Sequence, residues 1–553
     1  ILIPLRMADL IDQGIDLGNM AAVWKFSIAI LIFAALQLLT GVLSAHIAAK
    51  TSVGFSANLR QDMYDNVQTF SFSNIDKFST ASIVTRLTTD VTNIQNAYQM
   101  LIRMAVRGPV MLVFSMIVSF RINTTIALIF LAVIPIMAVL LLLIIRKVGP
   151  FFNRVFRTYD TLNNVVQENV RGIRVVKSFD QEDHEIKKFK GISQSIYEDF
   201  AAGERLLAFN SPIMQFFMYA CMILISWIGA KAIVASGNSA ALGMTTGDLT
   251  ALFSYATQIL MALMMLSMVF TMITISLASA RRIAEVLEEK TDIDNPTGAE
   301  MTVRDGSIRF EQVSFAYAAK ADKKVLSDID LSIVSGQTVG IIGGTGSSKS
   351  SLVQLIPRLY DVSSGRLLLG GVDVRKYDLD VLRNAVAMVL QKNELFSGTI
   401  KENLRWGNES ATDEEIEEAC RLACADEFIQ SFPDKYDTYI EQGGTNVSGG
   451  QKQRLCIARA LLKKPKVLIL DDFTSAVDTK TDASIQKSLS TFLPDTTKLI
   501  IAQRVSSVQH ADLIVVMDDG KIAACGTHDE LLKTCDIYRE VYESQQEGDS
   551  EHE

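Results

Sequence analysis

Long uncharged hydrophobic runs occur in the first half of the chain and not in the second. Four of them contain no Asp, Glu, Lys or Arg: residues 26–49, 122–145, 206–230 and 249–280. A membrane-spanning helix needs about 20 mostly apolar residues, so each run can cross a bilayer, and four such runs argue against a soluble protein. A shorter run lies at 108–120, and residues 1–10 resemble a helix end. We therefore predict an α-helical membrane domain over residues 1–285 with six spans, the first truncated, and further sequence before Ile1.

The segments between these runs differ in their basic content. Residues 146–205 carry 11 Lys and Arg and residues 50–107 carry six, whereas the other connections carry almost none. Because cytoplasmic loops of membrane proteins are enriched in Lys and Arg, we expect both basic segments in the cytoplasm, together with everything after Arg281. This predicts a multi-pass protein of the plasma membrane with a cytoplasmic second half.

The two basic segments are also periodic. Apolar residues recur at helical spacing from Leu162 to Ile173, with polar residues between them. This pattern indicates helices that continue beyond the bilayer, with residues 80–90 and 181–189 at their tips. A simple charged loop is the alternative.

The second half alternates strand and helix patterns. A polar linker is expected at 286–305, because it contains the helix-breaking sequence Asn-Pro-Thr-Gly. Short apolar strand patterns follow at 307–310, 338–342, 366–369, 386–390, 467–470, 498–502 and 513–517. They predict a mostly parallel α/β domain over 306–540 with an antiparallel N-terminal portion, followed by an acidic tail at 541–553.

A phosphate-binding loop follows the strand pattern at 338–342. Residues 343–350 read Gly-Gly-Thr-Gly-Ser-Ser-Lys-Ser, and an apolar helix is expected at 351–359. Backbone N–H groups and a helix N-terminus form an anion cradle in such loops, the Lys reaches the β- and γ-phosphates, and the last hydroxyl binds Mg²⁺. One position departs from the pattern, because Ser348 replaces the usual Gly and adds a Cβ where φ is restricted. The residues predicted to bind the nucleotide here are Gly343, Gly344, Thr345, Gly346, Ser347, Ser348, Lys349 and Ser350.

Two more motifs suit phosphate chemistry. The buried strand pattern at 467–470 ends in Asp471 and Asp472, which suits a carboxylate beside Mg²⁺. Residues 447–454 place Ser448 at the head of a helix as an N-cap, followed by two glycines whose N–H groups can approach an anion closely.

These motifs, together with Gln391 and the Ser-Ala-Val-Asp sequence at 475–478, occur in the order seen in ATP-binding cassette (ABC) transporters. Six helices followed by one cassette resemble a half-transporter of the exporter type, over nearly the whole chain. The resemblance implies that two cassettes close head to tail, with each ATP between the phosphate loop of one and the signature motif of the other. It also matches the expected loop tips to the family's coupling helices.

The resemblance assigns roles to single residues. Tyr317 is expected to stack on adenine, and Gln391 to sense Mg²⁺, which is bound by Ser350, Gln391 and Asp471. The residues expected at the partner's ATP site are Ser448, Gly449, Gly450, Gln451 and Asp478.

The catalytic positions are expected at Gln391, Asp472 and Gln503. Gln391 matches the family pattern, whereas the other two differ from it. The residue after the Mg²⁺-linked aspartate is usually Glu, the general base, and here it is Asp472, one methylene shorter. The switch position, usually His, is Gln503, which cannot carry a positive charge toward the developing phosphate charge. Such a pattern resembles the degenerate subunit of heterodimeric exporters, whose partner chain supplies an intact Glu and His. A homodimeric lipid or drug flippase and a cassette-gated channel are the alternatives.

Charge and composition refine this interpretation. The net charge of −9 argues against nucleic-acid binding. It divides into +4 over residues 1–280 and −13 over residues 281–553, as expected for a membrane bundle with basic extensions and a soluble ATPase. Nine of the 20 Met lie in residues 214–272. Met suits promiscuous apolar surfaces, but packing or lipid contact is the better explanation for most of these Met. The resemblance to heterodimeric multidrug exporters implies a small lipophilic substrate, besides membrane lipid, ATP and Mg²⁺.

Overall fold

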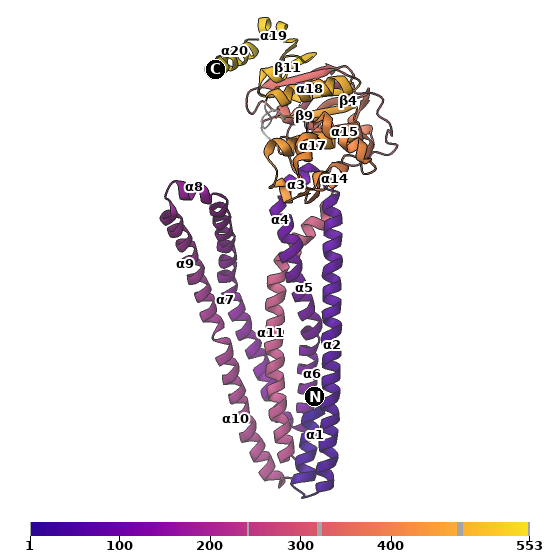
Figure 1. Cartoon of the computed structure of the whole chain (residues 1–553). Coiled ribbons are helices and arrows are strands. Elements are labelled where there is room, and N and C mark those ends of the chain that lie inside the picture. The colour runs from indigo at the N-terminus through magenta and orange to yellow at the C-terminus, as the bar shows by residue number, and fades with distance from the viewer. Residues whose placement is uncertain (1, 240–242, 318–322, 473–478, 551–553) are drawn as a thin grey trace. The chain divides into compact units, whose positions relative to one another are not determined.

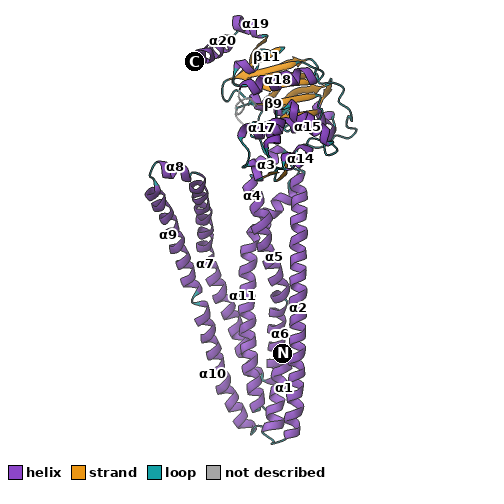
Figure 2. Ribbon diagram, viewed as in Figure 1, coloured by secondary structure: helices purple, strands orange, loops and turns teal. Residues whose placement is uncertain are grey.

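The computed structural model describes residues 2–239, 243–317, 323–472 and 479–550. It divides into two compact units. The membrane unit comprises Ile1–Gln68 and Thr80–Glu289, and the cassette unit comprises Thr69–Ser79 and Lys290–Glu553. Within the described residues, the strands lie in the cassette unit alone (Figure 2).

Among the described residues of the membrane unit, five helical stretches are long and apolar enough to cross a membrane. They are α2 (Met20–Gln68), the stretch Thr80–Ile122, α7 (Thr124–Arg171), the stretch Glu182–Ser236 and α11 (Thr246–Glu288). Each has 43 to 55 residues, or roughly 65–80 Å at 1.5 Å per residue, against a hydrocarbon layer of about 30 Å. These stretches are therefore about twice as long as the hydrocarbon layer is thick, or longer.

The count of six spans is not confirmed. The helix expected in residues 1–10 is present as α1 (Leu2–Leu10), which a π-helical turn, η1 (Ile11–Ile15), continues. At nine residues α1 is too short to span, so the described residues contain five candidate spans.

Two of the long stretches are composed of several helices (Figure 1). The first contains α4 (Thr80–Thr85), η2 (Arg86–Asp90), α5 (Val91–Met100), η3 (Leu101–Ala105) and α6 (Arg107–Ile122). The other contains α9 (Glu182–Leu207) and α10 (Asn210–Ser236). Helix α11 packs against α1, α5, α6 and α10, and buried apolar residues of α7, α10 and α11 form one shared cluster.

Both tips lie earlier in the chain than expected. Residues 80–90 belong to the helices α4 and η2, and the turn before them contains α3 (Phe72–Phe78). A capping box of Ser71 and Asn74 starts α3 here. At the other tip, Gly172 ends α7 and the short helix α8 (Ile173–Ser178) follows it. Asp180, with φ of 52°, then separates α8 from α9, so this tip lies before residues 181–189.

The described part of the cassette unit forms three sheets. A four-stranded antiparallel sheet has the order β2 (Leu326–Ile333), β1 (Ile308–Phe315), β4 (Ser364–Leu369) and β5 (Val372–Asp373). A six-stranded sheet has the order β12 (Lys521–Gly526), β11 (Leu513–Asp518), β3 (Thr338–Gly343), β10 (Thr497–Ile501), β9 (Val467–Asp471) and β6 (Val386–Val389). The two-stranded sheet pairs β7 (Gly398–Thr399) with β8 (Tyr439–Ile440).

This topology confirms the expected α/β domain. Five strands of the larger sheet are parallel, β12 is its antiparallel edge, and the seven expected strands are present. β12 was missed because its residues alternate between partly buried and exposed positions, whereas every residue of β9 and β10 is buried.

Short helices and turns complete the cassette unit. Besides α3, its described helices are α12 (Lys349–Gln354), α13 (Leu379–Ala385), α14 (Ile400–Arg405), α15 (Asp413–Leu422), α16 (Asp426–Ser431), α17 (Gly449–Leu462), α18 (Thr479–Phe492), α19 (His528–Thr534) and α20 (Asp536–Ser550). The 3₁₀ turns are η4 (Val374–Lys376), η5 (Lys435–Asp437), η6 (Gln442–Gly444) and η7 (Val505–Ser507).

Helix α12 differs from its expected range of 351–359. It begins at Lys349 and ends at Gln354. Pro357 disfavours helical geometry at the residue before it, and Arg358 has φ of 53°, so the helix cannot continue.

Candidate nucleotide-binding and hydrolysis site

Four neighbouring parallel strands bring the predicted site residues to one edge of the six-stranded sheet. The phosphate loop follows β3, Gln503 follows β10, Asp472 follows β9 and Gln391 follows β6. Ile501, the last residue of β10, is level with Ile341 of β3 and Asp471 of β9. Because parallel strands end on the same side, residues distant in sequence meet here, where ligands bind in open α/β sheets.

The backbone of the phosphate loop has the geometry of an anion cradle. A Cβ on Gly343 would collide with the carbonyl oxygen of Met517, and Gly346 has φ of 83°. Gly344, Thr345 and Gly346 are exposed, whereas Ser347 is buried. Only glycine adopts such backbone readily, and an open loop at a helix N-terminus suits phosphate.

Ser348 occupies the left-handed region, with φ of 70° and ψ of 23°. A non-glycine residue there costs roughly 1–2 kcal/mol. The restriction expected from the missing Gly is therefore real, yet the loop retains its fold and α12 starts at the next residue.

Lys349 lies across the loop. Its Nζ donates to the carbonyl oxygens of Gly343 at 2.8 Å and Gly344 at 2.9 Å, and to Ser347 Oγ at 3.2 Å. Burial lowers the pKa of Lys349, against the opposing effect of Asp471 and Asp472. The ammonium group is thus held by the loop that would receive the phosphates.

Asp471, at the end of β9, and Ser350, at the end of the phosphate loop, are predicted Mg²⁺ ligands and are hydrogen-bonded to each other near Lys349. Asp471 is buried, and burial raises its pKa, while a hydrogen bond from Ser350 and the charge of Lys349 oppose this rise. A carboxylate hydrogen-bonded to a hydroxyl beside a phosphate cradle fits Mg²⁺, which prefers oxygen ligands and is shared with substrate phosphates. Bound Mg²⁺ would neutralise phosphate charge at this point.

Asp472 is hydrogen-bonded to Gln503, the other altered catalytic position, and to Gln391. Its Oδ2 accepts one hydrogen bond from Gln391 Nε2 and another from Gln503 Nε2, each at 3.0 Å. Asp472 is buried and has φ of 51°, a conformation that Asp tolerates better than most residues. The residue at the general-base position is therefore held by two side-chain amides.

Tyr317 precedes the phosphate loop in the sequence and contacts the helix that follows the loop. It is about half exposed, and its hydroxyl lies 2.8 Å from Ser351 Oγ at the start of α12. Its ring packs edge-on against Phe315 and Tyr360. The remaining exposed aromatic surface is suited to stacking on a planar base.

Comparison with known proteins identifies the family. Residues 1–264 match the family model described as ABC transporter transmembrane region, and residues 326–475 match the model described as ABC transporter. Uncharacterized ABC transporter ATP-binding protein YfiB of Bacillus subtilis (strain 168) is 38% identical over 542 residues, which cover 98% of this chain and 93% of that protein. The chain belongs to the ABC transporter family.

Two further similarities extend this result. A protein named ATP-dependent lipid A-core flippase from Pseudomonas fluorescens (strain Pf0-1) is 34% identical, with 91% of this chain and 82% of the relative covered. A bacterial Atm1-family ABC exporter with ATP bound shares the fold, with a TM-score of 0.85 and 23% identity over 98% of this chain and 95% of the other. The chain is thus a multi-pass membrane protein with an ABC ATPase domain, in the fold of an exporter half-transporter.

The signature motif of this ABC transporter lies at the start of α17. Ser448 is the N-cap, as predicted, and forms a capping box in which Ser448 N donates to Gln451 Oε1 at 2.9 Å. Ser448 and Gly449 are exposed, and Gly450 is partly buried. The first turn of α17 therefore presents backbone N–H groups at the surface, as anion binding at a helix N-terminus requires. Asp478, also assigned to the partner's site, lies outside the described residues.

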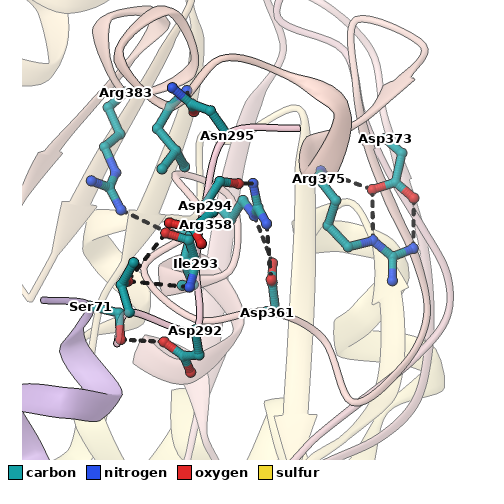
Figure 3. A network of polar contacts seen from close by, with 12 residues as sticks. Ser71, Asp292, Ile293, Asp294, Asn295, Arg358, Asp361, Asp373, Arg375 and Arg383 are labelled. Atoms are coloured by element: carbon teal, nitrogen blue, oxygen red, sulfur yellow. Dashed lines mark hydrogen bonds and ion pairs between the residues drawn. The ribbon is translucent and has the colours of Figure 1, made fainter. Parts of the chain in front are cut away.

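A contact between α3 and the ABC transporter's linker was not foreseen from the sequence. Burial opposes ionisation of Asp292, but hydrogen bonds from the hydroxyls of Ser71 and Ser73 outweigh it and lower the pKa of Asp292 (Figure 3). Arg358 donates to the carbonyl oxygen of Asp294 at 3.2 Å and pairs with Asp361. These contacts join α3, the linker and the turn after α12, and the capping box at Ser71 is their only local sequence signal.

The turn after α12 also contacts Tyr317, the residue predicted to stack on adenine. Tyr360 donates its hydroxyl to Asp76 of α3 at 2.8 Å, and its ring contacts both Phe72 and Tyr317. Burial and the Asp76 carboxylate raise the pKa of Tyr360. Tyr360 thus links α3 directly to the aromatic group at the nucleotide site.

The membrane unit contains a cavity of about 330 Å³. Apolar side chains from α5, α7, α9 and α11 line it, including Met100, Met264, Met268 and Met272. Asn210 also lines it, and its Oδ1 is buried without a hydrogen-bond partner among the described residues. The cavity therefore combines a deformable apolar wall with a few polar groups, from Asn210, Ser267 and Thr271.

Proposed function

We propose that this chain is one half of a heterodimeric ABC exporter and that it binds ATP firmly but hydrolyses it poorly at its own phosphate loop. Its signature motif, Ser448 to Gln451, completes a competent site on a different half-transporter that supplies Glu and His. The cassette lies in the cytoplasm below the plasma membrane, and Mg²⁺ binds with ATP at Ser350, Gln391 and Asp471.

The arrangement of Asp472 is the observation that carries this proposal. A general base has to accept a proton from the attacking water, and here the carboxylate is short and one oxygen already accepts two amide hydrogen bonds. Gln503 adds no positive charge. Proton transfer and transition-state stabilisation are therefore both weakened at the same place.

The binding half of the site supports the other part of the proposal. The loop cradle is formed, Lys349 lies on it, and Tyr317 presents an aromatic surface nearby. Selective change of the hydrolytic residues is easier to explain if a second, competent ATP site drives transport.

A small lipophilic compound is the proposed substrate. The cavity lined by four Met has the apolar, adaptable surface that such compounds need, and Asn210 offers an acceptor for one donor group. Lipid transport by a homodimer is the second candidate, because relatives that match most of this chain are named lipid A-core flippase.

The decisive experiment restores the two family residues. Asp472→Glu with Gln503→His is tested in the full chain with its partner in lipid nanodiscs, after the partner's own catalytic carboxylate is neutralised. We expect ATP turnover at this chain's site to rise at least about tenfold, since a correctly placed general base contributes 10²- to 10⁴-fold.

Asp471→Glu is the matched control, because it adds the same methylene at the neighbouring carboxylate and should not raise turnover. Thermal melting verifies folding, since Glu tolerates the left-handed backbone at position 472 less well than Asp. A wild-type site that already turns over as fast as the restored variant contradicts the proposal. Purification of an active dimer from this chain alone would favour the homodimer instead.

A further inference from the structure

Helix α20 is hydrogen-bonded to the loop that carries Gln503, the residue at the switch position. Gln545 Nε2 donates to the carbonyl oxygen of Gln503 at 2.8 Å, and Gln545 Oε1 accepts from the backbone N–H of Val505 at 2.8 Å. The two backbone groups flank Arg504. The side-chain amide of Gln545 carries both a donor and an acceptor, so it can bond to the main chain on both sides of Arg504.

The loop that Gln545 holds carries the side chain that contacts Asp472. β10 ends at Ile501 and η7 begins at Val505, so the loop between them is short. The side chain of Gln503 leaves this loop to reach Asp472 Oδ2 at 3.0 Å. Gln545 therefore holds the backbone of the same residue whose side chain meets the general-base position.

Helix α20 is docked well enough to act as an anchor. Tyr538 is buried, and its hydroxyl lies 2.8 Å from His528 Nδ1 of α19. Val541 and Tyr542 pack against the main core of the cassette unit. The next residue after Gln545, Gln546, is exposed and donates to the Tyr542 hydroxyl within the helix.

We propose that Gln545 is a positioning residue for the switch loop, so that the C-terminal helix sets the hydrolytic geometry of the site. The two hydrogen bonds from Gln545 hold the backbone of the loop and so restrict where the side chain at position 503 can point. Because these bonds use only backbone atoms of the loop, they act equally on Gln503 and on a His at that position. This inference rests on the proposed function only in taking residue 503 as the switch position.

The test places Gln545→Ala in the Asp472→Glu, Gln503→His chain, again as the full transporter. We expect kcat at this site to fall about tenfold, because small misplacement of a catalytic group is costly. The KM for ATP should stay within about twofold, because the hydrogen bonds of the Gln545 side chain go to the switch loop and not to the phosphate loop.

Gln546→Ala is the matched control. It removes the same side-chain amide one position further along α20, where the amide bonds only within the helix. It should alter neither kcat nor KM, so it separates the grip on the switch loop from a general effect of shortening a glutamine in this helix.

Hydrogen exchange supplies an independent readout. In the otherwise wild-type chain, Gln545→Ala should speed exchange at the Val505 amide, while amides of α19 and the first turns of α20 keep their protection. Gln545→Glu retains the acceptor for Val505 but loses the donor, so its exchange at Val505 should lie nearer to wild type.

The outcomes separate the two ideas. Unchanged exchange at Val505, or unchanged kcat in the restored background, overturns the positioning role. Faster exchange throughout α20 overturns it as well, because loss of docking would then explain the defect. If the restored residues fail to raise turnover, the degenerate-site proposal fails, whereas the exchange at Val505 still decides the role of Gln545.

Discussion

The phosphate loop after β3 and the loops after β9 and β10 lie at the same edge of one sheet, and they differ from the family pattern in opposite ways. The phosphate loop has one replacement, Ser348, and retains its cradle. The hydrolytic loops have two replacements, Asp472 and Gln503, and these bond to each other. The first region uses mainly backbone N–H groups, which any residue supplies, whereas the second uses side-chain atoms whose reach and charge change with each substitution. A site built from backbone N–H groups therefore tolerates substitutions that a site built from side-chain groups does not.

The largest effect is expected in the binding region. Lys349→Ala removes the cation that lies on the phosphate loop, and a charge-assisted hydrogen bond is worth roughly 1.5–3 kcal/mol, so ATP affinity at this site should fall about 10- to 100-fold. Equilibrium titration with a fluorescent ATP analogue measures it. Lys323→Ala, which removes an exposed cation paired with Asp519, is the control. Unchanged affinity in Lys349→Ala would remove the distinction between the two regions.

Tyr317 tests whether binding also depends on aromatic surface. Stacking of a base on an aromatic side chain is worth about 1–3 kcal/mol, so Tyr317→Ala should weaken ATP binding roughly tenfold in the same titration. Tyr317→Phe loses only the contact with Ser351 and should stay within about twofold. An equal loss in both variants would assign the effect to the hydroxyl and not to stacking.

Ser348→Gly probes the one replacement in the phosphate loop. Relief of the left-handed strain, roughly 1–2 kcal/mol, is partly offset by the entropy cost of Gly, so a net stabilisation of about 0.5 kcal/mol is expected. Differential scanning calorimetry of the purified transporter should record a small rise in Tm. Ser488→Gly within α18 should lower Tm, because glycine destabilises a helix interior. A fall in Tm for Ser348→Gly would show that the Ser side chain supports the loop.

The smallest effect is expected at Asp472 itself. Asn keeps the shape, tolerates the left-handed backbone and can accept the same amide hydrogen bonds, so Asp472→Asn should change ATP turnover by the transporter less than about twofold. Asp471→Asn, at the Mg²⁺-linked position, should reduce Mg²⁺-dependent ATP binding. If Asp472→Asn abolished turnover, Asp472 would be a working base and the two regions would be equally competent.

Local motifs were readable from the sequence because each depends on neighbours in the chain. The phosphate loop requires a strand, glycines and a helix start within a short stretch, and the Ser448 cap needs only Gln451. The loop tips were placed too late because the Ser71 capping box is a weak signal within a long helical pattern. β12 was missed because an edge strand lacks a continuous apolar run.

The sequence alone determined the long membrane helices, the cassette and the identity of the replaced catalytic residues, since hydrophobic runs and ordered motifs depend on local chemistry. Only the tertiary structure decided which of these residues meet. Asp472 reaches Gln391 across 81 positions and Gln503 across 31, and Gln545 reaches Gln503 across 42. These contacts follow from strand order in the sheet and from the docking of α20. Both are set by burial of distant apolar surfaces, which no local pattern encodes.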